Sequence, residues 1–176
     1  MERKCNAVVE RSCFLRKAER EDIETLFRWV NDSETRKNSF HSEPVNYEEH
    51  VEWFEKKDTD VNCGIYIFCD GKLEVGMLRL DFEGNETVIS YSIAKEFRNK
   101  GYGKKLIEAA EREICRWMES QKPNVETVSV KALVKKSNFA SNRIFASLMY
   151  EKRGMEYKKK ISLGEQDGKG ADESAE

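Results

Sequence analysis

Proline is almost missing from this chain, glycine is modest in number, and long apolar runs are absent. The 176 residues include two prolines and ten glycines, which excludes collagen-like and proline-rich low-complexity chains. No stretch approaches the roughly 18 apolar residues that a membrane-spanning helix needs. The first residues are charged and lack the apolar segment of a secretory signal. We therefore expect one globular domain in the cytoplasm, with no membrane contact.

An excess of positive charge is also lacking, since the formal net charge is −2 and the mean hydropathy is −0.76. Proteins that follow a nucleic-acid backbone are normally basic, so we expect no nucleic-acid partner. No CxxC pair occurs, and neither of the two histidines has a cysteine at ligand spacing, so we expect no metal. The cysteines are predicted to be reduced thiols, mostly in the core: Cys5, Cys13, Cys63, Cys69 and Cys115.

Helical and strand patterns follow one another closely over residues 12–163, between polar tails at 1–11 and 164–176. The C-terminal tail has no aliphatic residue larger than alanine, so it is predicted to be disordered. Strands are expected at 12–17, 63–69, 74–82, 86–93, 125–134 and 155–163, with helices near 23–30, 47–57, 104–120 and 138–149. This order indicates an α+β domain, a three-layer arrangement with helices on both faces of a mixed central sheet.

A glycine-bearing turn between a strand and the longest helix is the most informative segment. It reads Arg98-Asn99-Lys100-Gly101-Tyr102-Gly103-Lys104. Its glycines allow backbone N–H groups to converge on an anion, and the helix N-terminus adds free N–H donors and the positive end of its dipole. Its three basic residues supply charge at the same place. The segment therefore predicts a diphosphate-binding loop, although it has neither a Walker A pattern nor the third glycine of a dinucleotide fingerprint.

This loop resembles the R-x-x-G-x-G/A pyrophosphate loop of the GNAT acetyltransferase superfamily, and the order of elements matches as well. The segment from Asn138 to Phe145 is similar to a second family motif, N-x-x-[AS]-x-x-x-[YF]. The resemblance covers roughly residues 12–163 and implies the GNAT acyl-CoA N-acyltransferase fold, with acetyl-CoA as co-substrate and a primary amine as acceptor. It implies that acetyl-CoA is bound by Tyr91, Ser92, Ile93, Arg98, Asn99, Lys100, Gly101, Tyr102, Gly103, Lys104, Asn138, Ser141 and Phe145.

One position departs from the family pattern. Many relatives have a tyrosine where this chain has Phe145, and its hydroxyl can protonate the CoA thiolate as it leaves. Phenylalanine has no donor. Unassisted departure of the thiolate, protonation by a water and protonation by Tyr150 stay open as alternatives.

The N-terminal half resembles the nucleotide-sugar amine N-acetyltransferases of pseudaminic- and legionaminic-type sugar biosynthesis, over segments 27–32, 36–40, 47–54 and 75–81. This resemblance implies a nucleotide-linked amino sugar as the small-molecule acceptor. Arginine binds phosphates in bidentate geometry, and histidine titrates near neutral pH. The expected substrate contacts are Asn31, Arg36, His50 and Arg79. The candidate catalytic residues are His50, Glu43 and Ser90.

Two other functions compete with this interpretation. One is an N-acetyltransferase of a protein N-terminus or a small amine, which would not bind a nucleotide. The other is a non-catalytic acyl-CoA-binding module, which would bind acetyl-CoA without turnover. The sequence also leaves the oligomeric state open between a monomer and a homodimer.

Overall fold

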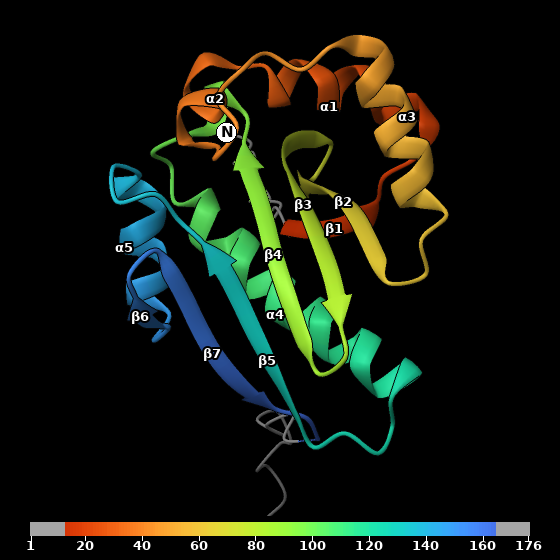
Figure 1. The fold of residues 1–176 in the computed structure, drawn as a ribbon, viewed down its shortest axis with the longest axis vertical. Helices are drawn as coiled ribbons and strands as arrows, with labels where there is room; N and C mark the ends of the chain where they lie inside the picture. The colour runs from red at the N-terminus through yellow and green to blue at the C-terminus, as the bar shows by residue number, and fades with distance from the viewer. Residues whose placement is uncertain (1–12, 165–176) are drawn as a thin grey trace, which may run out of the picture.

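A computed structural model describes residues 13–164, which form a seven-stranded mixed sheet with helices against both faces (Figure 1). The predicted GNAT-type α+β architecture is confirmed. The strands are β1 (Cys13–Lys17), β2 (Cys63–Asp70), β3 (Leu73–Glu83), β4 (Glu86–Ile93), β5 (Thr127–Leu133), β6 (Glu151–Arg153) and β7 (Glu156–Ser162). The helices are α1 (Ile23–Val30), α2 (Ser33–Asn38), α3 (Tyr47–Asp58), α4 (Tyr102–Gln121) and α5 (Phe139–Ser147), with short turns η1 (Arg20–Asp22) and η2 (Lys95–Phe97). The two predicted tails lie outside the described residues, except for Gly164.

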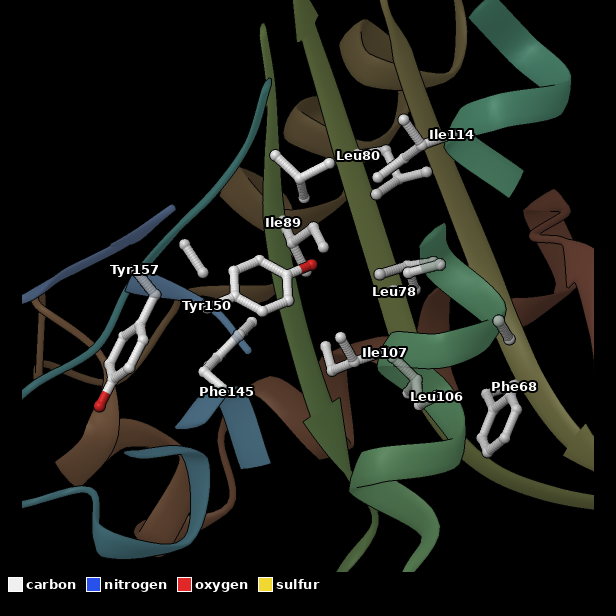
Figure 2. Packing of buried hydrophobic residues seen from close by; sticks show 14 of the residues in the cluster. Phe68, Leu78, Leu80, Ile89, Leu106, Ile107, Ile114, Phe145, Tyr150 and Tyr157 are labelled. Atoms are coloured by element: carbon white, nitrogen blue, oxygen red, sulfur yellow. The ribbon is translucent and has the colours of Figure 1, made fainter. Parts of the chain in front are cut away.

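Alternation along the central strands divides the core between the two faces of the sheet. Leu78 and Leu80 of β3 turn toward α4, where Leu106, Ile107 and Ile114 pack against them (Figure 2). On the opposite face, α3 packs on β2 and α1 lies beside β4, through a second cluster that contains Ala18, Ile23, Leu26, Trp29, Phe54, Ile65, Ile67, Cys69 and Ala94. The β3 residues that alternate with the leucines, Arg79 and Asp81, therefore lie on the α3 side of the sheet.

Two elements escaped the sequence analysis. Helix α2 lies within residues 31–44, where the sequence predicts no helix or strand, and none of its residues is buried. The side chain of Asp32 caps it by accepting a hydrogen bond from the Thr35 N–H. Strand β6 consists of three charged and exposed residues, and among the described strands it pairs only with β7. Neither element has the apolar periodicity on which prediction depends. The Asn46 side chain caps α3, since its Oδ1 accepts from the N–H groups of Glu48 and Glu49.

Strands β4 and β5 are parallel neighbours that separate soon after they meet. Their pairing covers only Glu86 to Val88 on β4, opposite Ser129 to Lys131 on β5. Toward their carboxyl ends the two arrows splay apart (Figure 1). On the β5 side, the backbone of residues 89–93 consequently has no strand partner in the described structure. The splay leaves backbone N–H and C=O groups of β4 open to a ligand, except for the Ile93 carbonyl, which accepts a hydrogen bond from the Arg98 Nε.

The C-terminus of α5 ends in a turn that favours glycine but contains methionine. Met149 has φ of 64°, and its side chain is 81% exposed. The N–H of Tyr150 bonds to the Phe145 carbonyl and the N–H of Met149 to the Ala146 carbonyl, the pattern of a Schellman motif with Met149 at its left-handed position. We expect Met149→Gly to raise the free energy of unfolding by about 0.5–1 kcal/mol in urea denaturation. Met149→Ala, which keeps the Cβ, is the control and is expected to give no gain.

Candidate active site

The free edge of β4 is backed by a side-chain bridge to α5. The Tyr91 hydroxyl and the Ser141 Oγ lie 2.8 Å apart and share a hydrogen bond. Burial raises the pKa of Tyr91 to about 12, and the hydrogen bond to Ser141 opposes that shift only in part. These two predicted residues therefore join β4 to α5 through their side chains. What β4 offers to a ligand along residues 91–93 is its backbone.

The loop after β4 turns sharply into α4 and leaves that helix uncapped. Asn99 and Gly101 both have left-handed backbone conformations, with φ of 59° and 81°. Gly101 is the N-cap of α4, so no side chain satisfies the first N–H groups of the helix. The first turn of α4 contains no acidic residue but does contain Lys104 and Lys105. Basic residues are unfavourable beside the positive end of a helix dipole unless an anion joins them, so this end of α4 is suited to a phosphate.

Gly103 allows α4 and α5 to approach closely. A Cβ built at this position would lie 2.6 Å from the Ile144 Cδ1 and 3.9 Å from a ring carbon of Tyr91. A larger residue here therefore requires the end of the Ile144 side chain to shift, and glycine also allows the N–H of residue 103 to lie near a phosphate. Sequence reasoning assigned Gly103 only to the loop, because the contact with Ile144 depends on the tertiary arrangement.

The basic residues of the loop are not equivalent. The Lys100 Nζ lies 5.7 Å from the centroid of the Phe97 ring, and both Lys100 and Lys104 are exposed. In contrast, the Arg98 guanidinium is bound to α2, where it pairs with Asp32 and Glu34. Tyr102 also turns its side chain away from the loop, since its hydroxyl donates to the Asp70 carboxylate at 2.6 Å. Lysine charge and backbone N–H groups thus remain for an anion, whereas Arg98 is engaged elsewhere.

Helix α5 brings Asn138 to the carboxyl end of β5 and buries Phe145. The Asn138 Oδ1 accepts a hydrogen bond from the Ser141 N–H and caps the helix. Phe145 is 0% exposed and packs among tyrosine rings, at 5.0 Å from Tyr150 and 5.3 Å from Tyr157 between centroids (Figure 2). Phe145 therefore packs the core in this structure, and its contact with acetyl-CoA stays a prediction.

A hollow of about 430 Å³ lies between α2 and the start of α5. It is lined by Ser33, Glu34, Lys37, Asn38, Ser137, Asn138, Phe139 and Ala140. Arg98 joins the end of β4 to α2, because it donates to both the Ile93 carbonyl and the Asp32 carboxylate. Lys135, in the segment after β5, donates through its Nζ to the Lys37 carbonyl of α2 at 2.9 Å. The hollow therefore lies at the open end of the β4–β5 splay, where a ligand between the strands would emerge.

Two predicted substrate residues hold the N-terminal segment together. The Asn31 side chain bonds to both the carbonyl and the N–H of Val45. The Arg36 guanidinium donates to the carbonyls of Val30 and His41 at 2.6 and 3.1 Å. These bonds fold the chain between α1 and α3, and the contact of Asn31 and Arg36 with the acceptor stays a prediction. Glu43, in the same segment, is exposed.

Other predicted residues do come together, as a row on the α3 side of the sheet. Arg79 and Ser90 are register partners on β3 and β4, and the Arg79 NH2 donates to the Ser90 Oγ at 3.3 Å. The Arg79 Nε donates to Asp81 at 2.8 Å, while its guanidinium carbon lies 5.7 Å from the Trp53 ring centroid. The His50 ring stacks on the Trp53 ring, with 5.5 Å between the two ring centroids. The row thus runs from His50 through Trp53 and Arg79 to Ser90.

His50 is the innermost member of that row. It is 4% exposed, it contacts Phe27, and its Nε2 has no hydrogen-bond partner among the described residues. Burial lowers the pKa of His50, and a backbone hydrogen bond at Ile23 opposes the shift only in part. An imidazole enclosed in this way is not exposed to an incoming amine, and the catalytic role of His50 stays a prediction.

The lowered pKa predicts an acid-sensitive fold. Because the folded pKa lies below the ordinary value of 6.5, the unfolded chain takes up the proton first as the pH falls. Above about pH 6.5, His50 therefore does not change the free energy of unfolding. Below that pH, it lowers the free energy of unfolding by at most about 1.4 kcal/mol for each pH unit. We expect His50→Gln to flatten the fall in Tm between about pH 7 and pH 5. His41→Gln, at the exposed second histidine, is expected to keep the wild-type profile.

Within residues 13–164, no group of three or more His, Cys, Asp or Glu is arranged to hold a metal ion. No helix in that same range is long and apolar enough to cross a membrane. The four cysteines of the described range are free thiols.

The fold and the sequence together define an enzyme that transfers an acetyl group from acetyl-CoA to an amine. The chain belongs to the GNAT acetyltransferase family, because the acetyltransferase (GNAT) domain matches residues 13–151. No curated protein sequence matches the chain significantly. The predicted superfamily is thus confirmed.

Solved structures agree on the fold. Aminoglycoside acetyltransferase AAC(6')-Ib in complex with coenzyme A superposes with a TM-score of 0.69 and 15% identity, over 84% of this chain and 94% of that one. Spermidine N-acetyltransferase from Vibrio cholerae, in complex with CoA and spermine, has a TM-score of 0.67 and 17% identity. The match covers 86% of this chain and 95% of that one. The ribosomal L7/L12 α-N-protein acetyltransferase RimL, in complex with CoA, has a TM-score of 0.67 and 13% identity, and the match covers 88% of this chain and 96% of that one. At these identities the likeness concerns the fold alone.

Proposed function

We propose that this enzyme acetylates the amino group of a nucleotide-linked amino sugar. The observation that carries the proposal is the composition of the hollow between α2 and α5. Its single carboxylate, Glu34, is already paired with Arg98. A polyamine or another polycation would need several unpaired carboxylates, whereas this lining offers Lys37 and a set of hydroxyl and amide groups.

An exposed aromatic ring strengthens the case for a sugar nucleotide. Phe139 is 70% exposed at the edge of the hollow, and such a ring can stack on a nucleobase or on the apolar face of a sugar. Ser33, Ser137 and Asn38 supply the short polar contacts that sugar hydroxyls require. Lys37 lies on the same lining and provides charge for a phosphate. Together these groups suit a neutral or anionic acceptor with many hydroxyls.

The opposite side of the splay has the features that acetyl-CoA requires. The backbone of residues 91–93 would pair with its pantetheine arm, and the N–H groups of Gly103 and Lys104 in the first turn of α4 would bind its pyrophosphate. Lys100 and Lys104 would add charge, and Asn138 would contact the arm from α5. Bound acetyl-CoA supplies a thioester that a neutral amine can attack. A β4 N–H donating to the developing oxyanion would contribute about 3 kcal/mol.

Proton transfer from the attacking amine needs a base that the amine can reach. Ser90 already accepts from Arg79, and His50 is enclosed. Glu43 is exposed on the segment that joins α2 to α3, so we assign it as the base candidate, acting directly or through a water.

The test is mass spectrometry of products formed from acetyl-CoA and a panel of UDP-amino-sugars, spermidine, kanamycin and N-terminal peptides. One acetyl group added to a UDP-amino-sugar supports the proposal. Acetylation confined to spermidine, kanamycin or a peptide replaces the sugar acceptor but keeps the acetyltransferase. CoA binding with no product on any amine points instead to a non-catalytic acyl-CoA-binding module.

A matched pair of variants on α5 tests the hollow itself. Phe139→Ala is expected to lower kcat/KM for the acceptor about tenfold and to leave the KM for acetyl-CoA unchanged, because it removes only the acceptor-side ring. Met149→Ala, at the exposed apolar residue beyond the other end of the helix, is the control and should change neither constant.

A further inference from the structure

Arg98 makes four hydrogen bonds, and none of its partners is a loop residue. Its Nε donates to the carbonyl of Ile93, the last residue of β4, at 3.0 Å. Its NH2 donates to Asp32 at 2.5 Å and to the Thr35 Oγ1 at 3.1 Å, and its NH1 donates to Glu34 at 3.2 Å. One guanidinium thus binds the end of β4 and the first turn of α2 simultaneously.

Helix α2 depends on contacts of this kind for its position. None of its six residues is buried, so apolar packing does not fix it. Its N-terminal end is bound by Arg98, and its C-terminal part accepts a hydrogen bond from Lys135 at the Lys37 carbonyl. Polar contacts with the segments that follow β4 and β5 therefore hold α2 across the open end of the splay (Figure 1).

The Arg98–Asp32 pair is well shielded for an ion pair at the rim of a site. Both side chains are 19% exposed. Burial alone would raise the pKa of Asp32, but hydrogen bonds from Arg98 and from the Thr35 N–H outweigh it and hold that pKa below its usual range. Glu34, the outer partner, lines the hollow between α2 and α5. The pair consequently joins the acetyl-CoA loop to the wall of the acceptor hollow.

We propose that Arg98 is a positioning residue that couples the acetyl-CoA loop to α2, and that it is not a ligand of the pyrophosphate. Binding of CoA at the loop orders residues 98–104 and, through Arg98, orders α2 beside the acceptor. Coupling between two sites is reciprocal, so an acceptor that contacts α2 favours the closed loop in return. The proposal rests on the acetyltransferase activity and is independent of which amine is acetylated.

Hydrogen–deuterium exchange tests the coupling without an acceptor, with CoA alone as the probe. In the wild type, CoA is expected to slow exchange of peptides covering residues 33–41 about fivefold. Arg98→Gln should speed that exchange about tenfold and abolish the response to CoA, while the Kd for CoA rises less than about threefold. Lys100→Gln is the matched control in the same loop. It should raise the Kd for CoA about tenfold and leave the exchange of α2 unchanged.

Asp32→Asn separates the ion pair from the helix cap. Asparagine keeps an oxygen for the Thr35 N–H but loses the charge that Arg98 binds. The double variant Arg98→Gln, Asp32→Asn should behave like Arg98→Gln alone, because that variant already removes the ion pair with Asp32. Arg98→Lys, which retains the charge, should restore part of the α2 protection. Unchanged exchange in the α4 core establishes that each variant is folded.

Two results would overturn the proposal. A rise of tenfold or more in the Kd for CoA with Arg98→Gln, together with unchanged exchange of α2, would make Arg98 a pyrophosphate ligand after all. No change in either measurement would show that the pair has no functional role. Failure of the UDP-amino-sugar panel would leave both measurements unaffected, so the two proposals stand or fall separately.

Discussion

Replacement of Phe145 by alanine is expected to lower the free energy of unfolding by about 4 kcal/mol. The ring is 0% exposed and lies 6.1 Å from Tyr91, 5.0 Å from Tyr150 and 5.3 Å from Tyr157 between ring centroids. Its removal takes away three aromatic contacts and leaves a cavity that rigid neighbours cannot easily fill. Since a domain of this size has a total stability of about 5–15 kcal/mol, the variant should approach instability at 37 °C.

Urea denaturation of two variants on the same helix measures this effect. Phe139→Ala removes an identical side chain that is 70% exposed, and we expect it to change stability by less than about 0.5 kcal/mol. A loss below about 1 kcal/mol for Phe145→Ala would contradict the core assignment. Phe145 packs α5 against Tyr91 of β4 and Tyr157 of β7, a role that needs no hydroxyl.

Gly103→Val is expected to raise the KM for acetyl-CoA about 30-fold, equivalent to about 2 kcal/mol of binding free energy. A Cβ at this position would lie 2.6 Å from the Ile144 Cδ1, so the Ile144 side chain must shift. The branched methyl groups of valine would also stand beside the N–H groups at the start of α4 and hinder the approach of a pyrophosphate. The kcat should fall much less, since the β4 backbone is unchanged. Steady-state kinetics with acetyl-CoA varied at saturating acceptor measure both constants.

A double variant distinguishes the two reasons for glycine at this site. Ile144→Val deletes the Cδ1 methyl that a new Cβ would meet. If packing alone requires glycine, Gly103→Ala combined with Ile144→Val should recover both the Tm and the Kd for CoA. If the N–H of residue 103 must approach the pyrophosphate, the Tm should recover while the Kd for CoA stays high. Wild-type kinetics for Gly103→Val would reject the loop as the acetyl-CoA site.

The fold was predictable because its central elements have strong periodicity. The alternation through Leu78 and Leu80 and the apolar stripe of α4 each identify an element and its buried face. Helix α2 and strand β6 were not predictable, since hydrogen bonds and ion pairs hold α2 in place and pairing with β7 holds β6. An interaction between a side chain and a distant carboxylate has no signature at the level of spacing.

The site was predictable only where the backbone forms it. Residues 91–93 and the turn through Gly101 lie where the motif placed them, and their conformation follows from the motif itself. The directions of charged side chains did not follow from it. Arg98, Arg36 and Arg79 were all assigned to phosphates, yet each is bound to groups within the protein. Their partners Asp32, Val30 and Asp81 become neighbours only after the chain has folded.

The brief pairing of β4 with β5 also bears on the solubility of the protein. Unpaired strand edges at the rim of a sheet recruit other chains and lead to aggregation. The rim of this sheet is blunted at one end by β6, whose Glu151, Lys152 and Arg153 are charged and exposed. The open row of β4 lies in the middle of the sheet, with α4 beneath it and α2 across its end (Figure 1). The protein thus keeps unpaired backbone groups where a slender molecule can enter and a strand of another protein cannot.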